Sequence, residues 1–239
     1  MSNIIKPVLI SIILVESALE RIDFLQRKKN QFKKYEKKQK KPLEKRILDV
    51  SIHNHLIQKI PEKIKRGRPD IIHTALLLAL DSRLNQEGYL RIYVHTRNDE
   101  VITFKPEVRI PRNYNRFIGL IEQLFEVKKI PPNVDQTLIS IKSQKIEDLI
   151  NKLYPDRVIL FSEKGIRTDD EKLQNIFSKN KNITILIGGF PHGDFSEKIL
   201  VLADEIFSIY DESLTTLSVL STVIQSAERK LLKNRIETE

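Results

Sequence analysis

The apolar positions of this 239-residue chain fall into short runs and periodic stripes that predict alternating strands and helices. Residues 7–15 form an apolar run rich in β-branched side chains, which is typical of a strand buried on both faces. A helix is expected to follow from about Ser17, and a second helical stripe spans residues 43–60. Residues 71–80 are almost entirely apolar behind Pro69, so a buried helix is expected there.

The periodicity changes in the middle of the chain. Between residues 90 and 110 apolar and polar side chains alternate, and the polar stretch 97–100 turns the chain, so a β-hairpin is expected. Asn113 or Asn115 then caps a helix whose apolar positions repeat at i, i+3, i+4, i+7 and i+8.

The last third of the chain alternates strands with helices. Thr168 and Glu171 form a capping box for one helix, and a terminal helix is expected from about residue 214 to 232. This alternation predicts a parallel sheet with helices on both faces, in which a ligand lies beyond the carboxyl ends of the strands. The expected strands are residues 157–162, 182–190 and 205–210.

Composition narrows the class of protein. With 40% apolar and 31% charged residues, the chain fits a soluble globular protein with one core, and residues 1–239 are expected to form a single domain. The absence of cysteine excludes disulfides, a thiolate metal site and a cysteine nucleophile. No apolar run approaches the roughly 20 residues of a membrane span. A signal peptide is the rival interpretation of the first run, but no small-x-small cleavage site follows it.

The net charge of +9 is placed unevenly along the chain. Residues 27–46 contain eleven Lys or Arg and two Glu, a net charge of 11 − 2 = +9, so the remainder is neutral. A solvated insert or mobile arm is one interpretation of this segment, and a phosphate-binding arm is the other.

A cluster of arginines without acids is the strongest chemical signal. Arg109, Arg112 and Arg116 fall within nine residues, and Arg116 lies in the first turn of a helix, where a cation opposes the helix dipole. A bound anion would resolve that conflict, and arginine forks suit phosphates and guanine edges. The alternative is a set of salt bridges to acids elsewhere in the fold.

Two further motifs offer weaker signals. In the segment 66–70, Asp70 either favours the helix N-terminus or holds Arg68 in one rotamer, and both interpretations stay open. Gly188 and Gly189 follow a strand and would let the backbone approach a ligand, although neither a dinucleotide fingerprint nor a P-loop is present. The five histidines have no metal-ligand spacing, so no metal site is expected.

Taken together, these segments resemble the Nep/Emg ribosome-biogenesis methyltransferases of the SPOUT superfamily, which act on pseudouridine in small-subunit rRNA. The resemblance runs from Pro7 to the final helix, and residues 27–46 look like an insertion. The matching motifs are Arg66-Gly67-Arg68-Pro69-Asp70-Ile71, Asp81-Ser82, Leu84-Asn85, Tyr93-Val94-His95-Thr96, residues 109–112 and 116–120, Ile187-Gly188-Gly189, His192-Gly193, Ser208-Ile209-Tyr210 and Ser213-Leu214.

The resemblance implies a particular fold and a cofactor. The fold would be α/β, a SPOUT-type parallel sheet with helices on both faces and a C-terminal trefoil knot, plus a β-hairpin insertion at 85–112 that contributes to the RNA surface. The cofactor would be S-adenosyl-L-methionine, and Ser213 stands where the family has a proline. The implied cofactor contacts are Ser162, Gly188, Gly193, Ile209, Tyr210, Asp211, Glu212, Ser213 and Leu214. The implied rRNA contacts are Arg68, steadied by Asp70, and Arg109, Arg112 and Arg116.

The implied activity is methylation of the N1 atom of a pseudouridine in small-subunit rRNA, during small-subunit ribosome biogenesis. A homodimer would carry it out in the cytoplasm, or in the nucleolus of a eukaryote, without a membrane or metal partner. No residue stands out as a general base; Asp81 is a candidate, with a structural role as the alternative. Other interpretations are a catalytically silent rRNA-binding assembly factor, a SPOUT methyltransferase for another RNA base, and a plain nucleotide-binding domain.

Overall fold

The computed structural model describes residues 8–22, 42–58, 60–132 and 136–232. Most of the lysine-rich segment 27–46 lies outside these residues, so the expectations for it stay predictions. The strands are β1 (Leu9–Ser17), β2 (Leu90–Thr96), β3 (Glu100–Phe104), β4 (Lys129–Ile130), β5 (Ile139–Ser143), β6 (Arg157–Arg167), β7 (Asn182–Gly188) and β8 (Glu205–Ser208). The α-helices are α2 (Val50–Ile57), α3 (Pro69–Asp81), α4 (Arg83–Gln86), α5 (Tyr114–Val127), α6 (Ile146–Leu153), α7 (Asp170–Lys179), α8 (Glu197–Leu200) and α9 (Thr216–Leu231), with 3-10 turns at Leu43–Lys45 and Lys63–Lys65.

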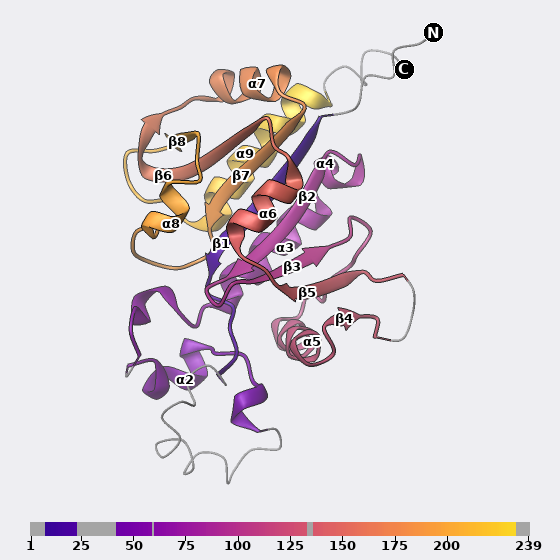
Figure 1. Ribbon diagram of the computed structural model, residues 1–239, viewed down its shortest axis with the longest axis vertical. Helices are drawn as coiled ribbons and strands as arrows, with labels where there is room; N and C mark the ends of the chain where they lie inside the picture. The colour runs from indigo at the N-terminus through magenta and orange to yellow at the C-terminus, as the bar shows by residue number, and fades with distance from the viewer. Residues whose placement is uncertain (1–7, 23–41, 59, 133–135, 233–239) are drawn as a thin grey trace.

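The strands form one mixed sheet in the order β4-β5-β3-β2-β1-β7-β6-β8 (Figure 1). The neighbours from β2 to β8 pair in parallel, whereas β3, β5 and β4 add antiparallel strands at the other edge. The predicted parallel sheet is thus one part of a mixed sheet. The predicted strands around residues 90–104 do pair antiparallel, because their short turn leaves no room for a crossover connection. Since β2 also pairs with β1, this pair belongs to the central sheet.

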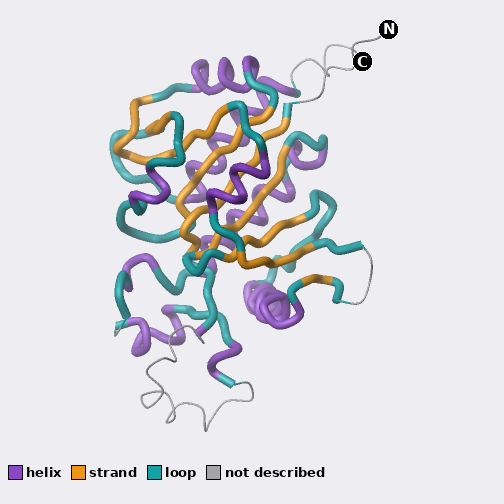
Figure 2. The backbone as a smooth tube through the Cα atoms, viewed as in Figure 1, coloured by secondary structure: helices purple, strands orange, loops and turns teal. Residues whose placement is uncertain are grey.

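The first strand lies at the centre of the sheet and is buried on both faces. Ile12 and Leu14 point into a core covered by α3, α5, α7 and α9, while Ile13 and Val15 point into a second core covered by α6 and α8. Figure 2 shows this layering, with strands between helices on both sides. The apolar run near the start is therefore a buried strand, and among the described residues no helix has the length and apolarity needed to cross a bilayer.

The helix expected from about Ser17 is wrong for the described part of that segment. Residues 18–20 form no helix, because their backbone groups bond to neighbouring segments instead. The Ala18 N–H donates to the Gly189 carbonyl at 2.7 Å, and the Glu20 carbonyl accepts from the Leu48 N–H at 2.8 Å. Tertiary backbone pairing thus overrides the helical spacing of Leu19 and Ile22, which are buried.

The helical stripe at residues 43–60 is broken into two pieces. A 3-10 turn covers Leu43–Lys45, and α2 begins only after Asp49, whose side chain accepts a hydrogen bond from the Ser51 N–H at 2.9 Å. Most apolar residues of this stripe form a separate small cluster with Ile22, at the end of the molecule where α2 lies (Figure 1), whereas Ile47 packs in the main core and Ile52 is exposed. Periodicity alone predicts one helix here, but the capping residue Asp49 lies inside the stripe and divides it.

Helix caps confirm one expectation and correct another. Asn113 caps α5, because its side chain accepts the Arg116 N–H at 3.1 Å. Helix α7, in contrast, is capped by Asp169, whose Oδ1 accepts the Lys172 N–H at 2.8 Å. The Thr168 capping box is wrong because the Thr168 N–H donates to Ser208 at 2.8 Å, so Thr168 continues the sheet pairing.

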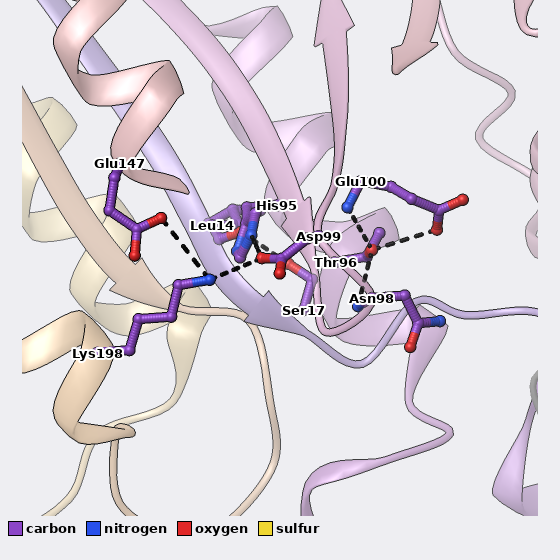
Figure 3. A network of polar contacts seen from close by, with 9 residues as sticks. All are labelled: Leu14, Ser17, His95, Thr96, Asn98, Asp99, Glu100, Glu147 and Lys198. Carbon is purple, nitrogen blue, oxygen red and sulfur yellow. Dashed lines mark hydrogen bonds and ion pairs between the residues drawn. The ribbon is translucent and has the colours of Figure 1, made fainter. Parts of the chain in front are cut away.

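A polar network joins the β2–β3 turn to the helices of the second core (Figure 3). The Asp99 carboxylate accepts hydrogen bonds from His95 Nε2 at 3.0 Å and Lys198 Nζ at 2.9 Å. Lys198 also lies 3.7 Å from a carboxylate oxygen of Glu147 on α6. Burial lowers the pKa of His95, which favours a neutral ring that donates to Asp99. The network fixes α8, and with it the end of the preceding loop.

Candidate cofactor cavity and arginine surface

A cavity of about 630 Å³ opens at the carboxyl ends of three parallel strands, β6, β7 and β8. Gly188 and Ser208 end β7 and β8 in its lining, whereas Ser162 lies within β6, just beyond the part that pairs with β7. The loops that follow β7 and β8 complete the wall. The first turns of α3 close the remaining side. The carboxyl edge is where ligands bind in open α/β sheets, so the cavity lies where the alternation of strands and helices predicts it.

Eight of the nine expected cofactor contacts line this cavity, because they all come from the same sheet edge. Asp211 is the exception; its carboxylate lies 3.5 Å from the Arg167 guanidinium on β6. As cofactor contacts these residues remain predictions. The eight are Ser162, Gly188, Gly193, Ile209, Tyr210, Glu212, Ser213 and Leu214.

Two glycines shape the wall. A Cβ on Gly188 would lie 3.1 Å from the Phe190 ring and 3.2 Å from the Phe195 ring. Gly193 has φ +99°, and a Cβ there would also lie 3.2 Å from Lys65 Cε. Glycine is favoured at both positions, which leaves backbone and ring faces to form this side of the cavity.

Side-chain hydroxyls hold the strand ends, and one of them, Thr216, belongs to no motif in the sequence. Thr216, at the start of α9, donates from Oγ1 to the Gly188 carbonyl at 2.6 Å. Ser208 donates to the carbonyl of Tyr210 in the next loop. A threonine or serine beside a helix start is an ordinary sequence feature, so no signal marked Thr216 before the fold joined it to β7.

Arg68 and Asp70 line the same cavity. Arg68 donates from Nε and a terminal guanidinium nitrogen to the two Asp70 oxygens at 2.8 and 2.7 Å. This fork lowers the pKa of Asp70 and holds the Arg68 guanidinium in place. Asp70 also lies in the first turn of α3, where a carboxylate favours the helix N-terminus. Asp70 therefore fits both interpretations that the sequence left open. The side chains are 39% and 46% exposed, which leaves them accessible to a ligand.

Arg109 and Arg112 border a second, smaller cavity of about 250 Å³. Their guanidinium groups lie 3.2 and 3.6 Å from the Asp81 carboxylate, so the salt-bridge alternative holds for these two residues. The arginine side chains are 74% and 85% exposed, and ion pairs this exposed contribute only about 0–1 kcal/mol. Both guanidinium groups therefore remain open to a stronger anion.

Asp81 lies with these arginines and not with the larger cavity. Asp81 and Asp70 lie on the same helix, and eleven residues at 1.5 Å rise separate them by about 16 Å. The geometry within one chain therefore favours the structural role of Asp81 over that of a general base.

Arg116 lines neither described cavity and is exposed in the first turn of α5. The loop before it is anchored from α3: His73 Nε2 lies 2.7 Å from the Pro111 carbonyl, and the ring stacks on Phe117 at 4.3 Å between centroids. Tyr114 donates its hydroxyl to Asp49, and burial, followed by this bond, raises the Tyr114 pKa. His73 thus supports the loop before α5. A structural role of this kind fits a histidine that has no metal-ligand spacing to another histidine.

Three titratable side chains also line the larger cavity. They are His192, Glu163 and Asp194, and Asp194 pairs at 2.7 Å with Lys164 on β6. Within the described ranges, no three acidic or histidine side chains meet in a geometry that could hold a metal ion. The lining is therefore mainly backbone, apolar side chains and a few charged groups.

The fold and the cavity together define an α/β protein with a cavity at the carboxyl edge of its parallel strands and with arginines at both ends of α3. The family profile described as EMG1/NEP1 methyltransferase matches residues 12–228. The chain therefore belongs to the EMG1/NEP1 methyltransferase family.

Individual relatives agree with this assignment. A protein of Staphylothermus marinus named ribosomal RNA small subunit methyltransferase Nep1 is 49% identical over 92% of this chain and 95% of its own length. A protein of the same name from Thermococcus kodakarensis is 40% identical over 93% of this chain and 99% of its own. The crystal structure of Archaeoglobus fulgidus Nep1 bound to S-adenosylhomocysteine superposes with a TM-score of 0.77 at 37% identity, covering 93% of this chain and 98% of that one.

Proposed function

We propose that this protein transfers a methyl group from S-adenosylmethionine to the N1 atom of a pseudouridine in small-subunit rRNA, during assembly of the subunit. The observation that carries the proposal is the larger cavity, where the expected cofactor loops meet the Arg68–Asp70 pair. The names of the relatives support an rRNA substrate, and S-adenosylhomocysteine in the A. fulgidus structure supports the cofactor.

The lining of the cavity fits such a cofactor. Ile209 and Leu214 offer partly exposed apolar surface to a purine ring, and the loop backbones supply polar groups for its edges. A Cβ at Gly188 would lie 3.1 Å from the Phe190 ring, so a larger residue there would crowd this wall. No residue need bind the cofactor through a charged side chain, which is consistent with the modest sequence signal of these loops.

The protein's part in the reaction is mainly to position the reactants. When bound, S-adenosylmethionine supplies a methyl group already activated on its sulfonium. The Arg68 fork, held by Asp70, would bind the RNA backbone or a base edge at the cavity mouth. The target base would leave its stack to enter the cavity, where holding N1 in line with the methyl carbon supplies roughly 7–11 kcal/mol.

We further propose that Arg109, Arg112 and Arg116 contact rRNA, that residues 85–112 form part of that surface, and that the chain acts as a knotted homodimer in the cytoplasm. Apolar exposure at the start of α9 supports the dimer, since Leu217 there is 42% exposed. Burial against a second copy would remove that apolar area from water.

The deciding experiment combines calorimetry with a methylation assay. Titration with S-adenosylmethionine should show one site per chain, and a stem-loop RNA with pseudouridine should accept methyl where the uridine version does not. No cofactor binding up to millimolar concentration would favour the silent assembly factor. Equal methylation of the uridine version would point to a different target base.

Replacing Arg112 by alanine is expected to weaken RNA binding by about 1–3 kcal/mol if the side chain reads a base edge. Cofactor affinity should not change, because Arg112 lies outside the larger cavity. Fluorescence anisotropy with a labelled stem-loop measures the effect. Arg157→Ala is the matched control, since Arg157 pairs with Glu205 at 2.8 Å at the opposite end of β6. An unfolded Arg112→Ala protein would show that the arginine is structural.

A further inference from the structure

Two segments far apart in sequence meet beside the larger cavity. The first is the loop of residues 189–196 between β7 and α8, here called the cofactor loop, which lines the cavity with Phe190, His192 and Gly193. The second is residues 65–70, here called the arginine segment, which contributes Arg68 and Asp70 to the same lining. The side chains between these segments decide whether one can move without the other.

Glu16 holds the far end of the cofactor loop. This residue ends the regular part of β1 with φ +50°, a left-handed conformation that is unfavourable for any residue except glycine. Only 9% of Glu16 is exposed, and its Oε1 accepts the Ser196 N–H at 3.3 Å. The other oxygen lies 3.1 Å from Lys65 Nζ, so one carboxylate binds both segments.

Lys65 contacts the beginning and middle of the same loop. The residue is 7% exposed, and Nζ lies 4.7 Å from the centre of the Phe190 ring, a cation–π distance. A Cβ on Gly193 would lie 3.2 Å from Lys65 Cε, so the lysine stem packs directly on the loop backbone. Glu16 and Lys65 therefore support the loop at its start, middle and end.

The backbone carries this support directly into the arginine segment. Arg66, the next residue, forms a buried bidentate ion pair with Glu20, and Arg68 follows two positions later. Six consecutive residues thus contain a support for the cofactor loop, an anchor to the segment that follows β1 and the arginine at the cavity. A packed, ion-paired connection of this kind lets a change at one end bias the other.

We propose that Lys65 and Glu16 are positioning residues that couple the cofactor loop to the arginine segment, so that cofactor and RNA bind with positive cooperativity. The inference rests on the proposed function, because it takes the two ligands from there. Coupling is reciprocal: the factor by which RNA tightens cofactor binding equals the factor by which cofactor tightens RNA binding.

The test is a linkage measurement on the full chain. S-adenosylhomocysteine, which has no methyl group to transfer, is titrated calorimetrically with and without a stem-loop RNA that carries pseudouridine at the target position. For the unchanged protein, RNA should tighten S-adenosylhomocysteine binding by about tenfold, within the usual range of coupling. Lys65→Met, which keeps an apolar stem, should reduce that factor to less than about twofold.

Two further variants separate coupling from stability. Glu16→Gln keeps an oxygen for the Ser196 N–H but loses the charge opposite Lys65, and should also reduce the coupling. Lys63→Met is the control, because Lys63 lies in the same turn, is exposed and bonds Gln58 at 2.8 Å, away from the loop. It should retain the full factor. Thermal unfolding of each variant checks that the fold persists.

Each remaining outcome overturns the inference. Coupling retained in both Lys65→Met and Glu16→Gln would show that the pair only stabilises the fold. Both ligands binding the unchanged protein without mutual effect would refute the coupling and leave the proposed function intact. No binding of S-adenosylhomocysteine at all would refute the proposed function, and the inference with it.

Discussion

Replacing Arg66 by methionine is expected to lower the free energy of unfolding by about 3–5 kcal/mol, because it leaves a charged carboxylate buried without its partner. Glu20 is fully buried and Arg66 is 6% exposed, and the guanidinium binds the carboxylate through Nε at 2.8 Å and through a second nitrogen. At about 2–4 °C per kcal/mol for a chain of this size, the melting temperature should fall by roughly 6–20 °C. Urea unfolding followed by circular dichroism measures the loss.

Arg68→Met is the matched control for this experiment. It removes the same kind of bidentate pair two residues later, but the Arg68 and Asp70 side chains are 39% and 46% exposed, so the stability loss should stay within about 1 kcal/mol. The double variant Glu20→Met/Arg66→Met should recover much of the loss, because two apolar side chains then replace the pair. Equal losses for Arg66→Met and Arg68→Met would contradict the assignment of a buried, structural ion pair.

Replacing Gly188 by valine is expected to weaken binding of S-adenosylhomocysteine by about 1–3 kcal/mol, the usual cost of overpacking a filled site. That corresponds to roughly 5- to 150-fold in the dissociation constant. The new side chain would meet the Phe190 and Phe195 rings, which lie 3.1 and 3.2 Å from the Cβ position, and push them into the cavity. Calorimetric titration measures the effect.

Gly119→Val provides the comparison at a glycine with free space. No atom lies within 4 Å of a Cβ built on Gly119, which is on the exposed side of α5, so cofactor affinity should be unchanged. A Gly188→Val protein that binds the cofactor normally would mean that the cofactor does not use this wall.

The elements that the sequence predicts best are those in which local and tertiary preferences agree. Helix α5 has a cap at Asn113 and an apolar face that packs on the main core, so its pattern and its environment give the same result. The same agreement makes β1 a buried strand. The sequence pattern predicts no element in the region 129–153, although this region forms β4, β5 and α6. Two of these elements have five residues or fewer, too short for a clear period.

The candidate site was predictable where backbone topology sets it and not where long-range side-chain contacts set it. Gly188 ends β7, and Ser162 lies just beyond the part of the neighbouring parallel strand β6 that pairs with it, so the expected fold brings them together. Lys65 and Glu16 are 49 residues apart, and nothing in their local sequence indicates that they meet. The distance between Asp81 and the cavity could not be predicted from the sequence either. A short motif does not reveal how long a helix separates it from the next motif.

Helix α3 sets a minimum length for any RNA that uses both groups of arginines. Arg68 precedes its first turn and Asp81, with Arg109 and Arg112, lies at its last, so the two groups are about 18 Å apart on a rigid spacer. An oligonucleotide long enough to reach both gains avidity, because its second contact forms at high effective concentration. A fragment too short to span the helix binds through one end alone, however well its sequence matches.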